Sequence, residues 1–177
     1  MINAVAFDLL GVVLEVNQLP LTPFQNELTR SFGVITSDSD FVNHFAQKSG
    51  KNVADVERIT RHVISLIYEI REPDLFMRLP NLKYAVASNH LSYISDWLRS
   101  FPISQNFDVF FTSGDRGLTK PSTAYFYALA RELEEPPANI LFIDDTAVNC
   151  EGAAAVGMKA VHFTRGMRLS DVVLYSL

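Results

Sequence analysis

Short runs of apolar residues, each followed by polar residues or glycine, recur along this chain. Five of these runs have the length and continuity of strands buried on both faces: residues 2–9, 82–87, 107–112, 139–143 and 158–163. Between and after the later runs, apolar residues return at helical spacing, over 91–100, 122–134, 147–156 and 169–175. This alternation predicts an α/β fold with a Rossmann-like three-layer core, in which helices cover both faces of a parallel sheet.

The stretch between the first two predicted strands has a different pattern. Apolar side chains fall three or four residues apart in three successive segments, with no strand between them. The first predicted helix places Phe24, Leu28 and Phe32 on one face, the second begins after Asp38 or Ser39, and the third covers 53–71. We therefore predict a small α-helical cap inserted after the first strand.

Two units follow from these patterns. The core domain is expected to comprise residues 1–16 and 73–177, and the helical cap residues 17–72. Within the core, the stretch 113–121 is polar and rich in glycine, which predicts a loop.

Composition narrows the class of protein. The chain has 177 residues, 48% of them hydrophobic, which suffices for one domain with a core and a small subdomain. A net charge of −5 without a basic block argues against a nucleic-acid surface. No apolar stretch approaches the roughly 20 residues of a membrane span. One cysteine, Cys150, permits no internal disulfide and fits a reducing compartment, so we expect a cytoplasmic protein.

Polar residues stand where several predicted strands end. Asp8 lies near the end of the first strand, Ser88 and Asn89 follow the second, and Asp144 and Asp145 follow the fourth, while Lys120 lies in a loop. Each alone also fits a turn or a helix cap, as do His90 and Cys150 nearby. Because the carboxyl ends of parallel strands share one edge of the sheet, we expect these side chains to meet.

Carboxylates, a serine hydroxyl and a lysine at one edge of the sheet suggest phosphoryl chemistry. Facing carboxylates repel each other unless a cation lies between them, and Mg²⁺ favours one or two carboxylates together with water and substrate phosphate. Lys120 supplies positive charge to a phosphate, and the Ser88 hydroxyl donates a hydrogen bond to it. An aspartate attacks phosphorus to form an aspartyl-phosphate, which water then hydrolyses.

Four segments carry a family resemblance. They are Phe7–Val12, Ala87–Asn89, Gly117–Pro121, and Leu141–Asp145 with Asn149. In order and separation these segments resemble the four motifs of the haloacid dehalogenase-like hydrolase superfamily, in its subfamily with a helical cap between motifs one and two. The resemblance covers the core, whereas the cap matches only in position and helical character.

The resemblance implies a role for each matching residue. Asp8 matches the nucleophile, Ser88 the phosphate-binding hydroxyl with Asn89 as its neighbour, and Lys120 the lysine that holds the phosphoryl group and the nucleophile together. For Mg²⁺, the implied ligands are Asp8, Asp145 and the backbone carbonyl of Leu10. Asp144 is implied to act on the metal directly or through water.

Leu10 departs from the pattern. Phosphatases of this superfamily usually carry a second aspartate there, which protonates the leaving oxygen and later activates water, and leucine transfers no proton. Three functions therefore stay open. The first is a Mg²⁺-dependent phosphatase for a small phosphorylated metabolite, with a good leaving group or with an acid borrowed from Glu15, His44 or His62. The second is a catalytically impaired protein that binds phosphate or a partner.

The third function is a dehalogenase that attacks carbon. Displacement of halide needs no metal, so Asp144 and Asp145 would have little purpose there, and the paired carboxylates favour the phosphatase. The sequence does not indicate the oligomeric state.

Overall fold

The computed structural model describes residues 1–164 and 166–177. Its centre is a five-stranded, all-parallel sheet in the order β5-β4-β1-β6-β7. The strands are β1 (Ala4–Phe7), β4 (Lys83–Ser88), β5 (Val109–Thr112), β6 (Ile140–Asp144) and β7 (Lys159–His162). The predicted parallel sheet is confirmed; β1, β5 and β7 are shorter than their apolar runs, whereas β4 and β6 keep the predicted length and are shifted by one residue.

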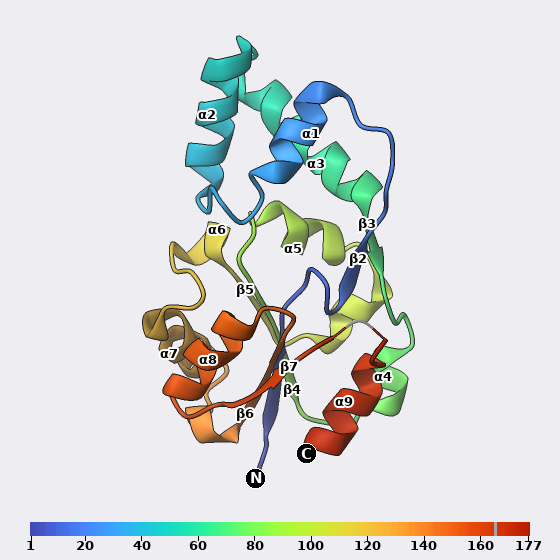
Figure 1. Ribbon diagram of the computed structural model, residues 1–177, viewed down its shortest axis with the longest axis vertical. Helices are drawn as coiled ribbons and strands as arrows, with labels where there is room; N and C mark the ends of the chain where they lie inside the picture. The colour runs from blue at the N-terminus through green and yellow to red at the C-terminus, as the bar shows by residue number, and fades with distance from the viewer. Residues whose placement is uncertain (165) are drawn as a thin grey trace.

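Alternate residues of the central strand face opposite layers. Ala4 and Ala6 pack into one hydrophobic cluster, and Val5 and Phe7 into the other. On the alanine side lie α7 (Thr123–Glu132) and α8 (Ala147–Ala155), because small strand residues let helices approach closely. On the other side lie α4 (Leu75–Arg78), α5 (Tyr93–Leu98) and α9 (Leu169–Ser176). The three-layer core is therefore confirmed (Figure 1).

Three helices stand beyond the carboxyl ends of the strands, at the top of Figure 1. They are α1 (Pro23–Arg30), α2 (Asp38–Ser49) and α3 (Val53–Ile67), called the helical insert below. Thr22 begins α1 through a reciprocal capping box with Gln25. The insert shares one continuous hydrophobic cluster with the sheet, through residues such as Phe41 and Val63. Its division from the core as a separate domain stays a prediction.

The structure corrects several predicted boundaries. Helix α3 ends at Ile67, and Tyr68–Ile70 form strand β3, which pairs antiparallel with β2 (Leu14–Val16). The apolar spacing of the helix continues through the three residues of β3, so the sequence pattern did not distinguish the strand from the end of the helix. Ser37, rather than Asp38 or Ser39, caps α2 by accepting from the amide of Asp40.

Two further corrections concern the core. The predicted loop 113–121 begins with a helical turn, α6 (Ser113–Arg116), which ends at Gly117 with φ +65°. The predicted helix 91–100 is shorter and is followed by the 3-10 helix Pro102–Asn106. Among the described residues, none of the helices is both long and apolar enough to cross a lipid bilayer.

Candidate active site

Strand register brings the predicted site residues to one edge of the sheet. Phe7 pairs with Val86 on β4 and with Ile143 on β6, so Asp8 emerges level with the ends of both neighbours. A cavity of about 580 Å³ opens at this edge. Six of the seven predicted site residues line it: Asp8, Leu10, Ser88, Asn89, Lys120 and Asp145. The seventh, Asp144, is fully buried and does not line the cavity.

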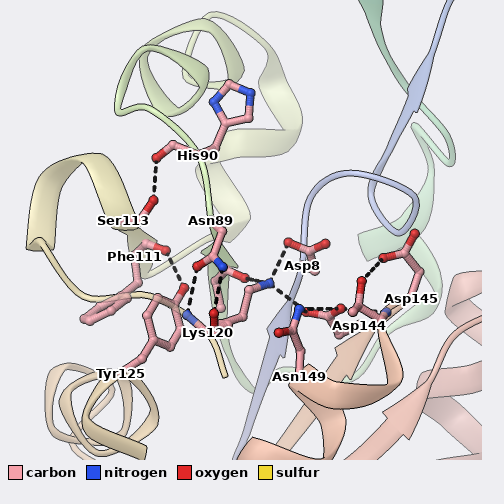
Figure 2. A network of polar contacts seen from close by, with 12 residues as sticks. Asp8, Asn89, His90, Phe111, Ser113, Lys120, Tyr125, Asp144, Asp145 and Asn149 are labelled. Atoms are coloured by element: carbon pink, nitrogen blue, oxygen red, sulfur yellow. Dashed lines mark hydrogen bonds and ion pairs between the residues drawn. The ribbon is translucent and has the colours of Figure 1, made fainter. Parts of the chain in front are cut away.

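Lys120 links the two strands that carry the acids. Its ammonium lies 2.8 Å from Asp8 Oδ1 and 2.6 Å from Asp144 Oδ2, and it also donates to the carbonyl oxygen of Ala87 at 2.8 Å (Figure 2). The lysine is 5% exposed, so these contacts are made almost without water. An ammonium has three N–H donors, and this one has three acceptors.

Asp144 is enclosed by hydrogen bonds on both oxygens. Asn149 Nδ2 lies 3.1 Å from each carboxylate oxygen, and the amide of Thr146 donates to Oδ1 at 2.8 Å. Since Lys120 takes Oδ2 as well, this carboxylate already has partners around it. The geometry supports a role in fixing Lys120, and direct metal contact by Asp144 stays a prediction.

Asn89 positions the backbone of Lys120. Its Oδ1 accepts from the Lys120 amide and its Nδ2 donates to the Lys120 carbonyl oxygen, both at 2.9 Å. This two-way contact holds the loop after β5 and α6 against the end of β4. Ser88, the last residue of β4, is 2% exposed and lines the cavity, as a phosphate-binding hydroxyl requires.

The buried charges do not balance. Asp8 and Asp144 share one lysine, and Asp145 adds a third carboxylate at the edge of the cavity. Burial raises the pKa of Asp8 to about 6, with Asp144 adding to the rise and Lys120 opposing it. Burial, and then Asp144, also raises the pKa of Asp145. Burial alone would lower the pKa of Lys120, but its two carboxylates outweigh that effect and raise it.

Carboxylate oxygens of Asp8, Asp144 and Asp145 lie within 4.8 Å of one another. Gly11 packs directly against the third of them: a Cβ there would overlap Asp145 Oδ2, and the φ of +80° also favours glycine. The donor set is all oxygen and carries excess negative charge, which suits a hard divalent cation such as Mg²⁺.

Arg71, directly after β3, holds the loop that follows Asp8. Its guanidinium donates to the carbonyl oxygens of Gly11 at 2.9 Å and Val12 at 3.0 Å, and it pairs with Glu15 at 2.7 Å. The sequence analysis missed this residue because it was expected in the last turn of a helix. Its position was not predictable from local pattern, since its partners lie about 60 residues earlier.

The weaker candidates lie elsewhere. His90 does not line the cavity; it is fully buried, and its Nε2 lies 3.1 Å from the hydroxyl of Tyr68. Burial lowers the pKa of His90 to about 4. Cys150 is a buried thiol. Burial raises its pKa to about 11, so the side chain packs rather than reacts. His44 and His62 are exposed on the helical insert and line neither the site cavity nor its neighbour.

Glu15 lines that neighbouring cavity of about 630 Å³, which shares Gly11, Val16 and Asp145 with the site. Other lining residues that sequence reasoning did not single out are Thr146 and Val148. They lie one and three residues after Asp145, so the pair Asp144–Asp145 was the sequence feature that could have pointed to them.

A family model described as haloacid dehalogenase-like hydrolase matches residues 75–157. Among curated proteins, a drimenol cyclase from Aspergillus calidoustus is 35% identical over 57 residues. That match spans 32% of this chain and only 11% of the relative's length.

Solved structures match over nearly the whole chain. A HAD family enzyme of Bacteroides thetaiotaomicron, in complex with magnesium and inorganic phosphate, gives a TM-score of 0.73 at 19% identity, covering 97% of this chain and 99% of that one. A predicted HAD-like hydrolase of Porphyromonas gingivalis gives 0.75 at 20% identity, covering 99% and 97%. The L-2-haloacid dehalogenase of Xanthobacter autotrophicus gives 0.70 at 15% identity, covering 98% and 82%. At these identities the likeness establishes the fold.

Proposed function

We propose that this chain, whose residues 75–157 match a haloacid dehalogenase-like hydrolase family model, is a Mg²⁺-dependent phosphatase for a small phosphorylated metabolite. In this proposal Asp8 is the nucleophile and carries the phosphoryl group as an aspartyl-phosphate. The Bacteroides thetaiotaomicron HAD family enzyme, solved in complex with magnesium and inorganic phosphate, motivates this choice of ligands.

One observation carries the proposal: three carboxylates cluster at the end of the central strands beside an open cavity, and two of them, Asp8 and Asp144, share a single lysine. The excess negative charge is costly at this depth unless a cation offsets it. Mg²⁺ held by Asp8, Asp145 and the Leu10 carbonyl would offset that charge and reduce the repulsion between Asp8 and an anionic phosphate.

The remaining roles belong to the chain itself. Lys120 keeps Asp8 ionised and oriented, since its ammonium contacts Asp8 Oδ1 and is anchored by Asp144. The Asp8 oxygen then attacks phosphorus, the bond to the leaving oxygen breaks, and water later returns the carboxylate. Ser88 would donate to a phosphate oxygen from the edge of the cavity.

The test is hydrolysis of p-nitrophenyl phosphate with and without Mg²⁺. We expect activity that requires Mg²⁺ and is lost in Asp8→Asn. Glu151→Gln is the control, because Glu151 is exposed and makes no ion pair among the described residues. Titration calorimetry with Mg²⁺ alone should show binding that Asp145→Asn weakens. Turnover that is independent of metal, or that survives Asp8→Asn, would contradict the proposal.

A second function is favoured by Leu10, which lines the cavity and carries no ionisable group. The chain would then bind a phosphorylated ligand without turning it over. Saturable binding of inorganic phosphate in the presence of Mg²⁺, together with no hydrolysis of p-nitrophenyl phosphate, would identify this function. Hydrolysis of a 2-haloacid by the wild-type chain would instead point to attack on carbon.

A further inference from the structure

The cavity around Asp8 offers few protons. Of the described residues that line it, three carry ionisable side chains: Asp8, Lys120 and Asp145. All the others are apolar or hold neutral hydroxyl and amide groups. A phosphate ester with an alcohol leaving group needs a proton on the departing oxygen, because charge develops there as the bond to phosphorus breaks.

None of the three ionisable groups is placed to give that proton. Asp8 attacks phosphorus in the proposed function, and Asp145 must be ionised to hold the cation. Lys120 directs its three N–H donors to Asp8, to the Ala87 carbonyl and to Asp144, so none of them faces the cavity.

Leu10 lines this cavity and has no proton to donate. Its side chain packs against the hydrophobic cluster beneath the sheet edge, and its backbone bridges to Leu14. Glu15, the next acid along the chain, lines the neighbouring cavity and is paired with Arg71 at 2.7 Å. Its carboxylate is therefore engaged outside the cavity that contains Asp8.

We propose that the site selects phosphoryl donors whose leaving group departs as a stable anion: acyl phosphates and phosphoanhydrides. This inference rests on the proposed function. Carboxyl groups have pKa values near ~4, so a carboxylate leaves without being protonated.

The steps balance without an acid. An Asp8 oxygen forms a bond to phosphorus, and the phosphorus–oxygen bond to the leaving group breaks, its electron pair leaving on the carboxylate or phosphate. Water then attacks the aspartyl-phosphate; the electron pair of the broken bond returns to Asp8, and one proton passes to solvent. Among the described residues that line the cavity, Asp145 is engaged by the cation and Lys120 by its three acceptors, so neither is free to activate this water; the second step is slow and the phosphorylated protein accumulates.

The experiment compares donors and follows the protein itself. Wild-type chain with Mg²⁺ is mixed with acetyl phosphate or with a simple alkyl phosphate, and the intact mass of the protein is followed for addition of one phosphoryl group. We expect the adduct with acetyl phosphate only, and its absence in Asp8→Asn. Steady-state kcat/KM should favour acetyl phosphate strongly over the alkyl phosphate.

Leu10→Asp and Leu10→Asn separate proton transfer from polarity. Leu10→Asp should raise kcat/KM for the alkyl phosphate by about 10²- to 10⁴-fold, the usual contribution of a general acid, and should shorten the life of the adduct. Leu10→Asn, which has a similar shape and no transferable proton, should do neither. Glu15→Gln should leave the ratio between donors unchanged.

The outcomes distinguish a failure of the leaving-group inference from a failure of the proposed phosphatase function. If an Asp8-dependent adduct forms equally fast from both donors, or if Glu15→Gln widens the ratio between them, the inference on leaving groups is overturned while the phosphatase proposal stands. If no adduct and no Asp8-dependent turnover appear with either donor, both are overturned. The comparison of donors on the wild-type chain decides this even if a Leu10 variant does not fold.

Discussion

Replacing Asp8 by asparagine should make the metal-free protein more stable while abolishing its activity. Asp8 and Asp144 are buried against one ammonium, so the group carries one uncompensated negative charge. Asparagine keeps the shape and a hydrogen-bond acceptor for Lys120 but removes that charge. The Lys120–Asp144 pair that remains is neutral overall.

The size of the gain follows from the pKa of Asp8. Burial raises it from 3.8 to about 6, so the native state holds a proton that the unfolded chain releases. Ionising the buried group therefore costs stability as pH rises from about 4 to 6, by about 3 kcal/mol at pH 7 for a shift of this size. Some contact with Lys120 is weakened in the variant, and we expect a net gain of about 1–3 kcal/mol.

Urea unfolding without Mg²⁺ at pH 7 and pH 5 measures this gain. It should be largest at pH 7 and fall to about half at pH 5, where the wild-type carboxyl is mostly protonated. Added Mg²⁺ should stabilise the wild-type chain and should stabilise Asp8→Asn much less. Glu151→Gln, which removes an exposed carboxylate, should change stability by less than about 0.5 kcal/mol.

An Asp8→Asn protein that is less stable than the wild type at pH 7 without metal would contradict this prediction. That result would mean that the ion pair with Lys120 contributes more than the burial of the extra charge costs. A gain of equal size at pH 5 and pH 7 would also contradict it, because the benefit would then not come from ionisation.

Three further predictions concern residues around the site. Gly11→Ala should lower the free energy of unfolding by at least about 1 kcal/mol and weaken Mg²⁺ binding in calorimetry, because its Cβ would overlap Asp145. The control Gly50→Ala, with φ +69° and open space around it, should lose stability without affecting Mg²⁺ binding. His90→Gln should reduce acid sensitivity: the pKa of His90 is lowered to about 4, so its neutral form contributes stability that is lost as pH falls from about 6.5 to 4, and urea unfolding should show the wild type losing stability relative to the variant between pH 7 and pH 5. Asn149→Ala should cost about 1–3 kcal/mol in the same assay, since its amide donates to both oxygens of buried Asp144; an unchanged midpoint would show that water replaces it.

Much of the core was predictable because its signals are local. An apolar run that ends in a carboxylate, such as the segment that reaches Asp8, indicates a strand buried on both faces whose end lies at a polar edge of the sheet. A few neighbouring residues suffice to show this pattern. The same holds for the strands that end at Ser88 and Asp144. Once the sheet is parallel, these ends must share one edge, so the composition of the candidate site followed from the sequence as well.

The boundaries that failed are those where two patterns overlap. Residues 68–70 continue the apolar spacing of the preceding helix, yet they form β3 because β2 offers a partner about 50 residues earlier. The helical turn at 113–116 has a polar, glycine-containing sequence typical of a loop. It is stabilised by long-range contacts, including Ser113 and Gly114 donating to the carbonyl oxygen of His90.

The alternation of strands and helices in the core, the helical insert after the first strand, and the polar residues at the edge of the sheet could all be read from the sequence. How those residues divide their contacts became visible in the folded chain. It assigned Lys120 to two carboxylates and Asn89 to the backbone of Lys120, and it enclosed Asp144 while leaving Asp145 at the cavity. The physical reason is that hydrogen bonds and charge pairs act over a few ångströms, so partners separated by many residues become defined only when packing has fixed their distances.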